Sequence, residues 1–103
     1  MSPEEGAKLQ AALIGTCDVT ATQAPDGPMK EAKGLNITFS ADGKIKWDVL
    51  GGLAFGNVGT YRLDGRNIEA DILYKHMRVD DYSGKTLKLF LYDITQIYYC
   101  TKR

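Results

Sequence analysis

Short segments in which apolar and polar residues alternate run from Gly15 to the C-terminus, and they constrain the fold more than any other feature. A period of two places every second side chain on one face of an extended chain, so each segment predicts a half-buried β-strand. A less regular stretch surrounds Met77 and Val79. The positions assigned to the inner face are Cys17, Val19 and Ala21; Leu35, Ile37 and Phe39; Ile45, Trp47 and Val49; Tyr61 and Leu63; Ile68, Ala70 and Ile72; Leu87, Leu89 and Leu91; and Ile97, Tyr99 and Thr101.

Three dipeptides that favour tight turns separate neighbouring segments: Asp42-Gly43, Asp64-Gly65 and Ser83-Gly84. Glycine adopts the positive φ that short hairpin loops require, so the strands on either side should be antiparallel neighbours. No long helical pattern lies between the strands, which argues against parallel βαβ units. The expected fold class is therefore all-β, a small antiparallel up-and-down barrel of seven to eight strands between residues 16 and 102.

The first residues predict a short helix. Ser2 is suited to cap its N-terminus, and Pro3 fits the first helical position, where its missing N–H costs nothing. Leu9 and Leu13 lie one turn apart and give the segment a narrow apolar face. We expect a helix over residues 3–13 that packs these leucines against an open end of the barrel.

Length and charge limit the classes to which the chain can belong. Its 103 residues should form one domain, residues 1–103, with a single core. The 13 basic and 13 acidic residues cancel, so little long-range field attracts nucleic acid or an anionic membrane. No hydrophobic run approaches the roughly 20 residues of a membrane span, and no signal peptide is recognisable. We expect a soluble domain, either cytoplasmic or the mature form of an exported protein.

Two connections are longer than tight turns. Residues 23–34 are polar and contain two prolines, whereas residues 50–56 (LGGLAFG) are rich in glycine and carry Leu53 and Phe55. Apolar side chains in a connection need cover, so these two either cap the core or meet a protein partner. We expect the two connections to define the working end of the barrel.

Several phrases of the sequence resemble one known family. They are Gly15-Thr16-Cys17, Ile37 to Lys44 (ITFSADGK), Gly59 to Gly65 (GTYRLDG), Ser83 to Leu89 (SGKTLKL) and Tyr98 to Arg103 (YYCTKR). Together with the N-terminal helix, they are similar to the compact bacterial lipocalin-like domains of the calycin group over nearly the whole chain. The resemblance implies a barrel that binds a small molecule.

In that family a Gly-x-Trp motif opens the first strand, and its tryptophan packs beneath a basic residue that follows the last strand. This chain keeps Gly15 and Arg103 but has Cys17 at the tryptophan position, so the usual aromatic–arginine stack is missing. The chain is also shorter than a typical ligand-carrying lipocalin. Its cavity should therefore be small or absent.

Eight strands enclose an interior that side chains can fill or that one small ligand can occupy. The candidate ligand-binding residues are Phe39, Trp47, Phe55, Tyr61, Leu89 and Tyr99. These residues either fill the core or line an apolar pocket whose polar edges orient a ligand.

The sequence contains no recognisable catalytic or metal-binding group. His76 is the only histidine, and we expect it to be solvated rather than a haem or metal ligand. Asp80 and Asp81 would point to opposite faces of a strand, so a turn before Ser83-Gly84 explains them better than a cation site. We expect no enzyme activity, no catalytic residue, no metal and no cofactor.

Three classes of function remain. The first is a non-catalytic module that holds a small apolar or amphipathic ligand in the barrel. The second is a protein-interaction module that uses Leu53 and Phe55, or resembles the small calycin-type protease inhibitors, whose N-terminal tail enters the protease cleft. The third is a domain of an envelope assembly. A mobile Met1–Glu5 would favour the inhibitor class, and a docked helix would count against it.

The two cysteines lie in the first and last strands, which a closed meander makes neighbours. Alternation of Ile97, Tyr99 and Thr101 places Cys100 on the outer face, whereas Cys17 holds an inward position. Side chains on opposite faces diverge and cannot reach disulfide geometry. We therefore expect two free thiols, with Cys100 the more accessible.

Overall fold

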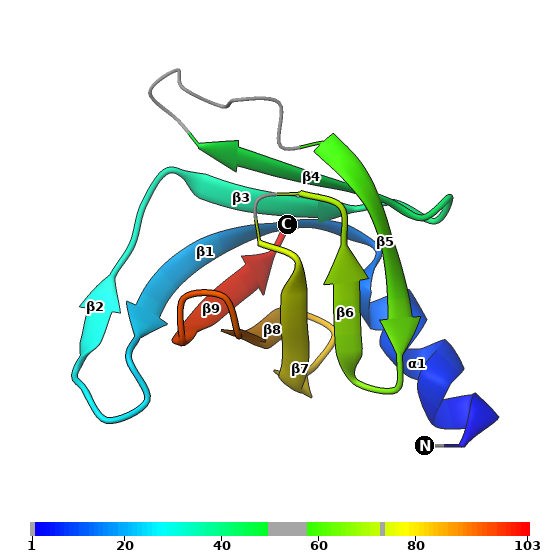
Figure 1. The fold of residues 1–103 in the computed structure, drawn as a ribbon, viewed down its shortest axis with the longest axis horizontal. Coiled ribbons are helices and arrows are strands. Elements are labelled where there is room, and N and C mark those ends of the chain that lie inside the picture. The colour runs from blue at the N-terminus through cyan, green and yellow to red at the C-terminus, as the bar shows by residue number, and fades with distance from the viewer. Residues whose placement is uncertain (1, 50–57, 73) are drawn as a thin grey trace.

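The computed structural model describes residues 2–49, 58–72 and 74–103. In these ranges one helix precedes nine strands (Figure 1). The elements are α1 (Pro3–Leu13), β1 (Gly15–Gln23), β2 (Met29–Glu31), β3 (Leu35–Phe39), β4 (Lys44–Val49), β5 (Val58–Asp64), β6 (Asn67–Ala70), β7 (His76–Tyr82), β8 (Thr86–Leu91) and β9 (Gln96–Lys102). The all-β class and the helix over residues 3–13 are confirmed.

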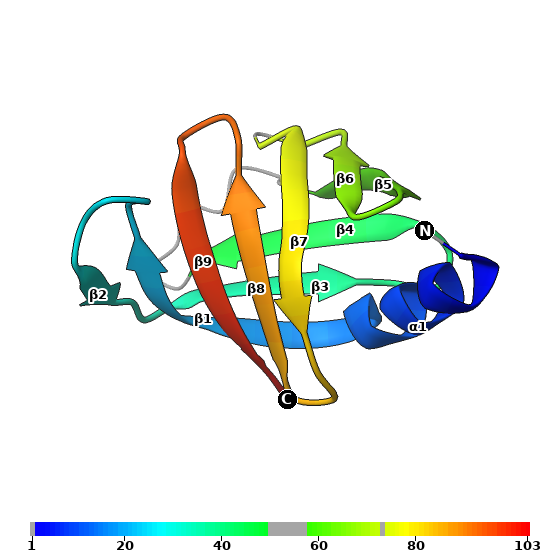
Figure 2. The ribbon, with the colours of Figure 1, turned by 90° about the horizontal axis from the view of Figure 1, so that it is seen from below.

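Eight of the described strands close into a barrel. They pair antiparallel in the order β1, β3, β4, β5, β6, β7, β8 and β9, and β9 pairs back with β1. The remaining strand, β2, is 3 residues long and pairs with the end of β1, where Ala21 lies opposite Glu31. Figure 2 shows β7, β8 and β9 crossing in front of β1, β3 and β4. The predicted up-and-down barrel is confirmed.

The barrel has two unlike ends. Tight turns join β3 to β4, β5 to β6 and β7 to β8 at the closed end, beside α1 (Figure 1). The open end carries the connections from β1 through β2 to β3, from β4 to β5, from β6 to β7 and from β8 to β9. Residues 23–34 of the predicted working end lie at the open end, and residues 50–56 lie outside the described residues.

The inner face of the barrel is apolar and densely buried. Its fully buried members, together with the two leucines of α1, are Leu9, Leu13, Val19, Ile37, Phe39, Ile45, Ile68, Met77, Val79, Leu87, Leu89 and Leu91. Gly59 lies opposite Ile45, and a Cβ at Gly59 would stand 2.1 Å from the Asp71 carbonyl oxygen. Only glycine at position 59 therefore allows β5 to lie this close to the backbone of Asp71.

Helix α1 covers the closed end. The Ser2 hydroxyl accepts a hydrogen bond from the Glu5 amide at 3.2 Å, which is the predicted N-cap. Leu9 and Leu13 are 0% exposed and belong to the barrel core. Because a helix this short is marginal in isolation, the burial of these two side chains helps to hold it in place. The predicted packing of Leu9 and Leu13 against one end of the barrel is confirmed, and this end is the one that carries the tight turns.

Lys102 anchors the end of α1. Its Nζ donates hydrogen bonds to the carbonyl oxygen of Ala12 and, at 2.9 Å, to that of Ile14. Carbonyls at a helix C-terminus lack intrahelical partners and attract a cation. Arg103, the basic residue on which the resemblance draws, instead forms an exposed ion pair of 3.0 Å with Asp18. The basic residue at the base of the barrel is therefore Lys102.

Replacing Lys102 with methionine should lower the free energy of unfolding by about 1.5 kcal/mol, because the helix carbonyls lose charge-assisted hydrogen bonds. Methionine keeps most of the aliphatic stem. Equilibrium urea unfolding measures the change, with Lys85→Met as a control because Lys85 is exposed in a turn. Equal losses in the two variants would contradict the anchoring role.

Cys17 and Cys100 form a disulfide with Cα atoms 5.5 Å apart, so the prediction of two free thiols is wrong. Both side chains are buried, at 1% and 2% exposed. Cys100 lies opposite Val19 on one side and Leu87 on the other, and both of these neighbours point into the core. The inner residues of β9 are thus Tyr98 and Cys100.

The facing of β9 was predicted wrongly because Ile97, Tyr98, Tyr99 and Cys100 are all apolar or aromatic, and alternation cannot choose between two such sets. Ile97, Tyr99 and Thr101 lie on the outer face. Ala21 is also outward, because the register of β1 against β9 shifts between Val19 and Ala21. A β-bulge of this kind reverses which face the following residues present.

Candidate ligand-binding site

Four of the candidate residues point into the barrel: Phe39, Trp47, Tyr61 and Leu89. Phe39 and Tyr61 pack edge to face, with ring centroids 5.1 Å apart. The Tyr61 hydroxyl accepts a hydrogen bond from Gln10 Nε2 at 2.9 Å and donates one to the Ser40 carbonyl at 3.1 Å. This pair therefore ties α1 to the closed end of the barrel. Phe55 and Leu53 lie outside the described residues.

Trp47 lies in the half of β4 nearer the open end and packs against two aromatic rings. Its ring centroid is 5.3 Å from that of Tyr74 and 5.9 Å from that of Tyr98. Trp47 is 4% exposed, whereas the two tyrosines are only partly buried. We name these three residues the aromatic cluster.

Sequence reasoning found Trp47 but missed the two tyrosines. Tyr98 alternates with Ile97 and Tyr99, which were predicted to face inward, so it was expected on the outer face. Tyr74 belongs to the connection from β6 to β7, in which no alternation marks a facing.

The aromatic cluster carries two hydroxyls, those of Tyr74 and Tyr98. Among the described residues, neither the Tyr74 nor the Tyr98 hydroxyl has a hydrogen-bond partner, whereas those of Tyr61 and Tyr99 are bonded within the fold. Among the described residues, no fully buried side-chain nitrogen or oxygen atom lacks a hydrogen-bond partner. Burial, and then the neighbouring Tyr74, raise the pKa of Tyr98, which keeps its phenol protonated.

Tyr99 lies on the outer face, so its assignment to the barrel interior is wrong. Its hydroxyl donates to Gln23 Oε1 at 2.7 Å, and Lys88 Nζ stands 5.7 Å from its ring centroid. Tyr99, Lys88 and Thr20 help to line a shallow depression of about 280 Å³ on the outside of the barrel.

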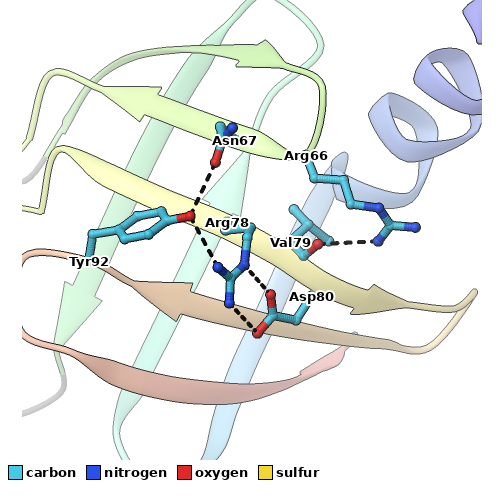
Figure 3. A network of polar contacts seen from close by, with 6 residues as sticks. All are labelled: Arg66, Asn67, Arg78, Val79, Asp80 and Tyr92. Carbon is cyan, nitrogen blue, oxygen red and sulfur yellow. Dashed lines mark hydrogen bonds and ion pairs between the residues drawn. The ribbon is translucent and has the colours of Figure 1, made fainter. Parts of the chain in front are cut away.

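Arg78 organises a polar network on the outer face of β7 (Figure 3). Its guanidinium pairs with Asp80 and donates to the Tyr92 hydroxyl at 3.2 Å, and this hydroxyl lies 3.5 Å from Asn67 Oδ1. The hydrogen bond to Asp80 raises the pKa of Arg78. The hydrogen bonds of this network are made between residues of the fold itself.

The remaining polar candidates also lie on the outer face. His76 is exposed, as predicted, and its backbone amide donates to Asp93 Oδ2 at 3.0 Å. Asp80 and Asp81 belong to β7, where the register against β8 shifts between Val79 and Asp81, so the predicted turn is wrong. In the described part of the chain, no three acidic, cysteine or histidine side chains come together as metal ligands would.

Helix α1, the one helix in the described ranges, is not long and apolar enough to span a membrane.

No protein-family model and no curated protein matches this sequence. Among solved structures, a lipocalin-like protein from Bacteroides uniformis is similar, with a TM-score of 0.74 and 18% identity, over 89% of this chain and 99% of that one. An uncharacterized protein from Bacteroides eggerthii has a TM-score of 0.73 and 14% identity, over 88% of this chain and 99% of its own. At sequence identities this low, the similarity concerns the fold alone. The chain has the lipocalin-like fold, as the resemblance implied.

Proposed function

We propose that this protein is a non-catalytic binding module that holds a small apolar or amphipathic molecule at the open end of its barrel. The observation that supports the proposal is the aromatic cluster, in which the rings of partly buried Tyr74 and Tyr98 lie 5.3 and 5.9 Å from the ring of buried Trp47. Aromatic rings offer large apolar surfaces, and tyrosine adds a polar group at their edge. Apolar walls with a few polar groups are typical of small-molecule sites.

Of the candidate residues, Trp47 is the one that we retain for ligand contact, with Tyr74 and Tyr98 added. Phe39, Tyr61 and Leu89 support the proposal as the packed core beneath the site. Because side chains fill the barrel toward its closed end, a ligand would be confined to the open end. We expect the ligand to be small for this reason.

The inhibitor alternative has less support. It requires a free N-terminal tail, whereas α1 is capped by Ser2 and docked through Leu9 and Leu13. A partner at the open end remains the second candidate, because Met29 and Val58 there are 56% and 59% exposed. Large exposed apolar residues at one end favour contact with another molecule.

The test uses Trp47, the only tryptophan of the chain, as an intrinsic reporter. We expect Nile red, a neutral dye whose emission rises in apolar surroundings, to bind the protein and to quench Trp47 emission. Tyr98→Ala should weaken dye binding at least about tenfold, or about 1.4 kcal/mol, because the ligand loses ring contacts. Fluorescence titration gives the dissociation constants.

Tyr99→Ala is the matched control, since Tyr99 is the next residue of β9 and faces outward. It should leave dye affinity unchanged. Far-UV circular dichroism and thermal unfolding verify that both variants are folded. The absence of dye binding by the wild-type protein, or equal weakening by both variants, would contradict the proposed site.

A further inference from the structure

Two rows of polar side chains cross β5, β6 and β7 on the outer face of the barrel. Directly opposed residues of antiparallel strands point to the same side of the sheet. The two rows are Arg62, Glu69 and His76, and Asp64, Asn67 and Arg78. Ile68 and Met77, which also oppose each other, are 0% exposed and belong to the core, so the residues that alternate with them face outward.

Tyr92 extends these rows from the end of β8. Its backbone amide donates to the His76 carbonyl oxygen at 3.0 Å, which places it beside β7. Its side chain reaches over β7 to β6, where the hydroxyl lies 3.5 Å from Asn67 Oδ1 (Figure 3). The Phe90 ring packs edge to face against it at 5.0 Å, and the Arg78 guanidinium carbon stands 5.5 Å from its centroid. The ring is thus held in place although 43% of Tyr92 is exposed.

A depression of about 270 Å³ lies between Tyr92 and the two rows. Asp64, Asn67, Glu69 and His76 contribute to its lining, and the lining residues belong to the described ranges. The volume is slightly below the roughly 300 Å³ of the smallest typical ligand pockets, so the depression has room for one small ring.

The lining combines an aromatic ring with planar polar groups. The carboxylates of Asp64 and Glu69 accept hydrogen bonds, whereas the Asn67 amide both donates and accepts them. The C–H bonds on one face of a sugar ring pack on the negative face of an aromatic ring. The hydroxyls around a sugar ring donate to carboxylates and exchange hydrogen bonds with amides. The arrangement therefore suits a saccharide.

Other classes of ligand fit this lining less well. An anionic ligand would meet the carboxylates of Asp64 and Glu69. The guanidinium groups nearby are already engaged, since Arg62 pairs with Glu69 and Arg78 with Asp80. A purely apolar ligand would remove water from the carboxylates without replacing their hydrogen bonds. A neutral ligand with several hydroxyls meets neither penalty.

We propose that this depression binds the ring of a neutral saccharide, with one face of the sugar on Tyr92 and its hydroxyls bonded to the polar side chains around it. The site lies on the outside of the barrel. The inference therefore goes beyond the proposed function and does not depend on binding at the open end.

The test titrates the isotope-labelled protein with glucose, galactose and mannose at neutral pH and follows the backbone amides by NMR. We expect at least one sugar to bind with a dissociation constant on the order of 1 mM, because a single ring buries little surface. The largest shifts should fall on the amides of Asn67, Glu69 and His76. The uronate of the same sugar, which adds a carboxylate to the same ring, should bind at least about fivefold more weakly.

Tyr92→Ala should weaken binding of that sugar at least about tenfold, because it removes the aromatic surface. Tyr99→Ala is the matched control. It makes the same substitution on the outer face of β9, outside the depression, and should leave the affinity unchanged. The amide spectrum of each variant verifies that it is folded.

Three results would overturn the inference. The first is the absence of binding by all three sugars, and the second is a set of shifts centred away from the depression or equal weakening by both variants. The third is a uronate that binds as tightly as its neutral sugar, which would refute the neutral class. The wild-type titrations decide the matter even if Tyr92→Ala fails to fold. Nile red binding is measured separately, so failure of the proposed function at the open end is distinguishable from failure of this site.

Discussion

Replacing Cys17 and Cys100 together with alanine is expected to lower the free energy of unfolding by about 4.5 kcal/mol. The disulfide joins residues separated by 83 positions, and a crosslink over so long a loop removes much of the entropy of the unfolded chain. It also fastens β1 to β9, the two strands whose pairing closes the barrel. Urea unfolding of the wild-type protein and of the double variant measures the difference.

The double variant also removes the two buried sulfur atoms and so leaves unfilled volume in the core. Reduction of the wild-type protein is the control for this effect. Incubation with dithiothreitol during unfolding should give a similar loss without altering any side chain. Thiol titration of unreduced, denatured protein should find no reactive thiol. Two reactive thiols under these conditions would mean that Cys17 and Cys100 are not joined. Disulfides persist in oxidising compartments, so the bond favours an exported protein over a cytoplasmic one.

The alternation of apolar and polar residues predicted the barrel because it sets the local conformation and the buried face at once. In β3, Ile37 and Phe39 are separated by polar Thr38, so only one facing buries the apolar residues. The helix was predictable for a similar reason, since the Ser2 cap and the spacing of Leu9 and Leu13 are local features. Signals that lie within a few residues needed no knowledge of the tertiary structure.

The facing of the last strand depends on tertiary contacts that the sequence does not display. Tyr99 is satisfied on the outside by Lys88 and Gln23, which lie in two different strands. The bulge after Val19 likewise arises from pairing between β1 and β9, and no glycine or proline marks it in the sequence. Cys100 reaches Cys17 only if it faces the inside of the barrel. Because the prediction assigned the inner and outer faces of β9 the wrong way round, it also excluded the disulfide.

The candidate site was predicted in part for the same reason. Trp47 lies in a strand whose alternation is unambiguous, so its inward position was correct. Tyr98 depends on the frame of β9, and Tyr74 on the path of an irregular connection. Phe39 and Tyr61 were found, but their role at the closed end depends on contacts with α1 and with Ser40. A list of inward aromatic residues therefore does not distinguish the floor of a site from the packing of a core.

Leu13→Ala should destabilise the protein by about 3 kcal/mol, within the usual range for a buried leucine. The side chain is 0% exposed in the core at the closed end, and its removal leaves a cavity that the surrounding barrel can fill only in part. Lys8→Ala is the control on the same helix, because Lys8 is exposed and alanine keeps the helix propensity. Urea unfolding with tryptophan fluorescence measures both variants. A loss below about 0.5 kcal/mol for Leu13→Ala, like that expected of a surface substitution, would show that α1 does not close the barrel in solution.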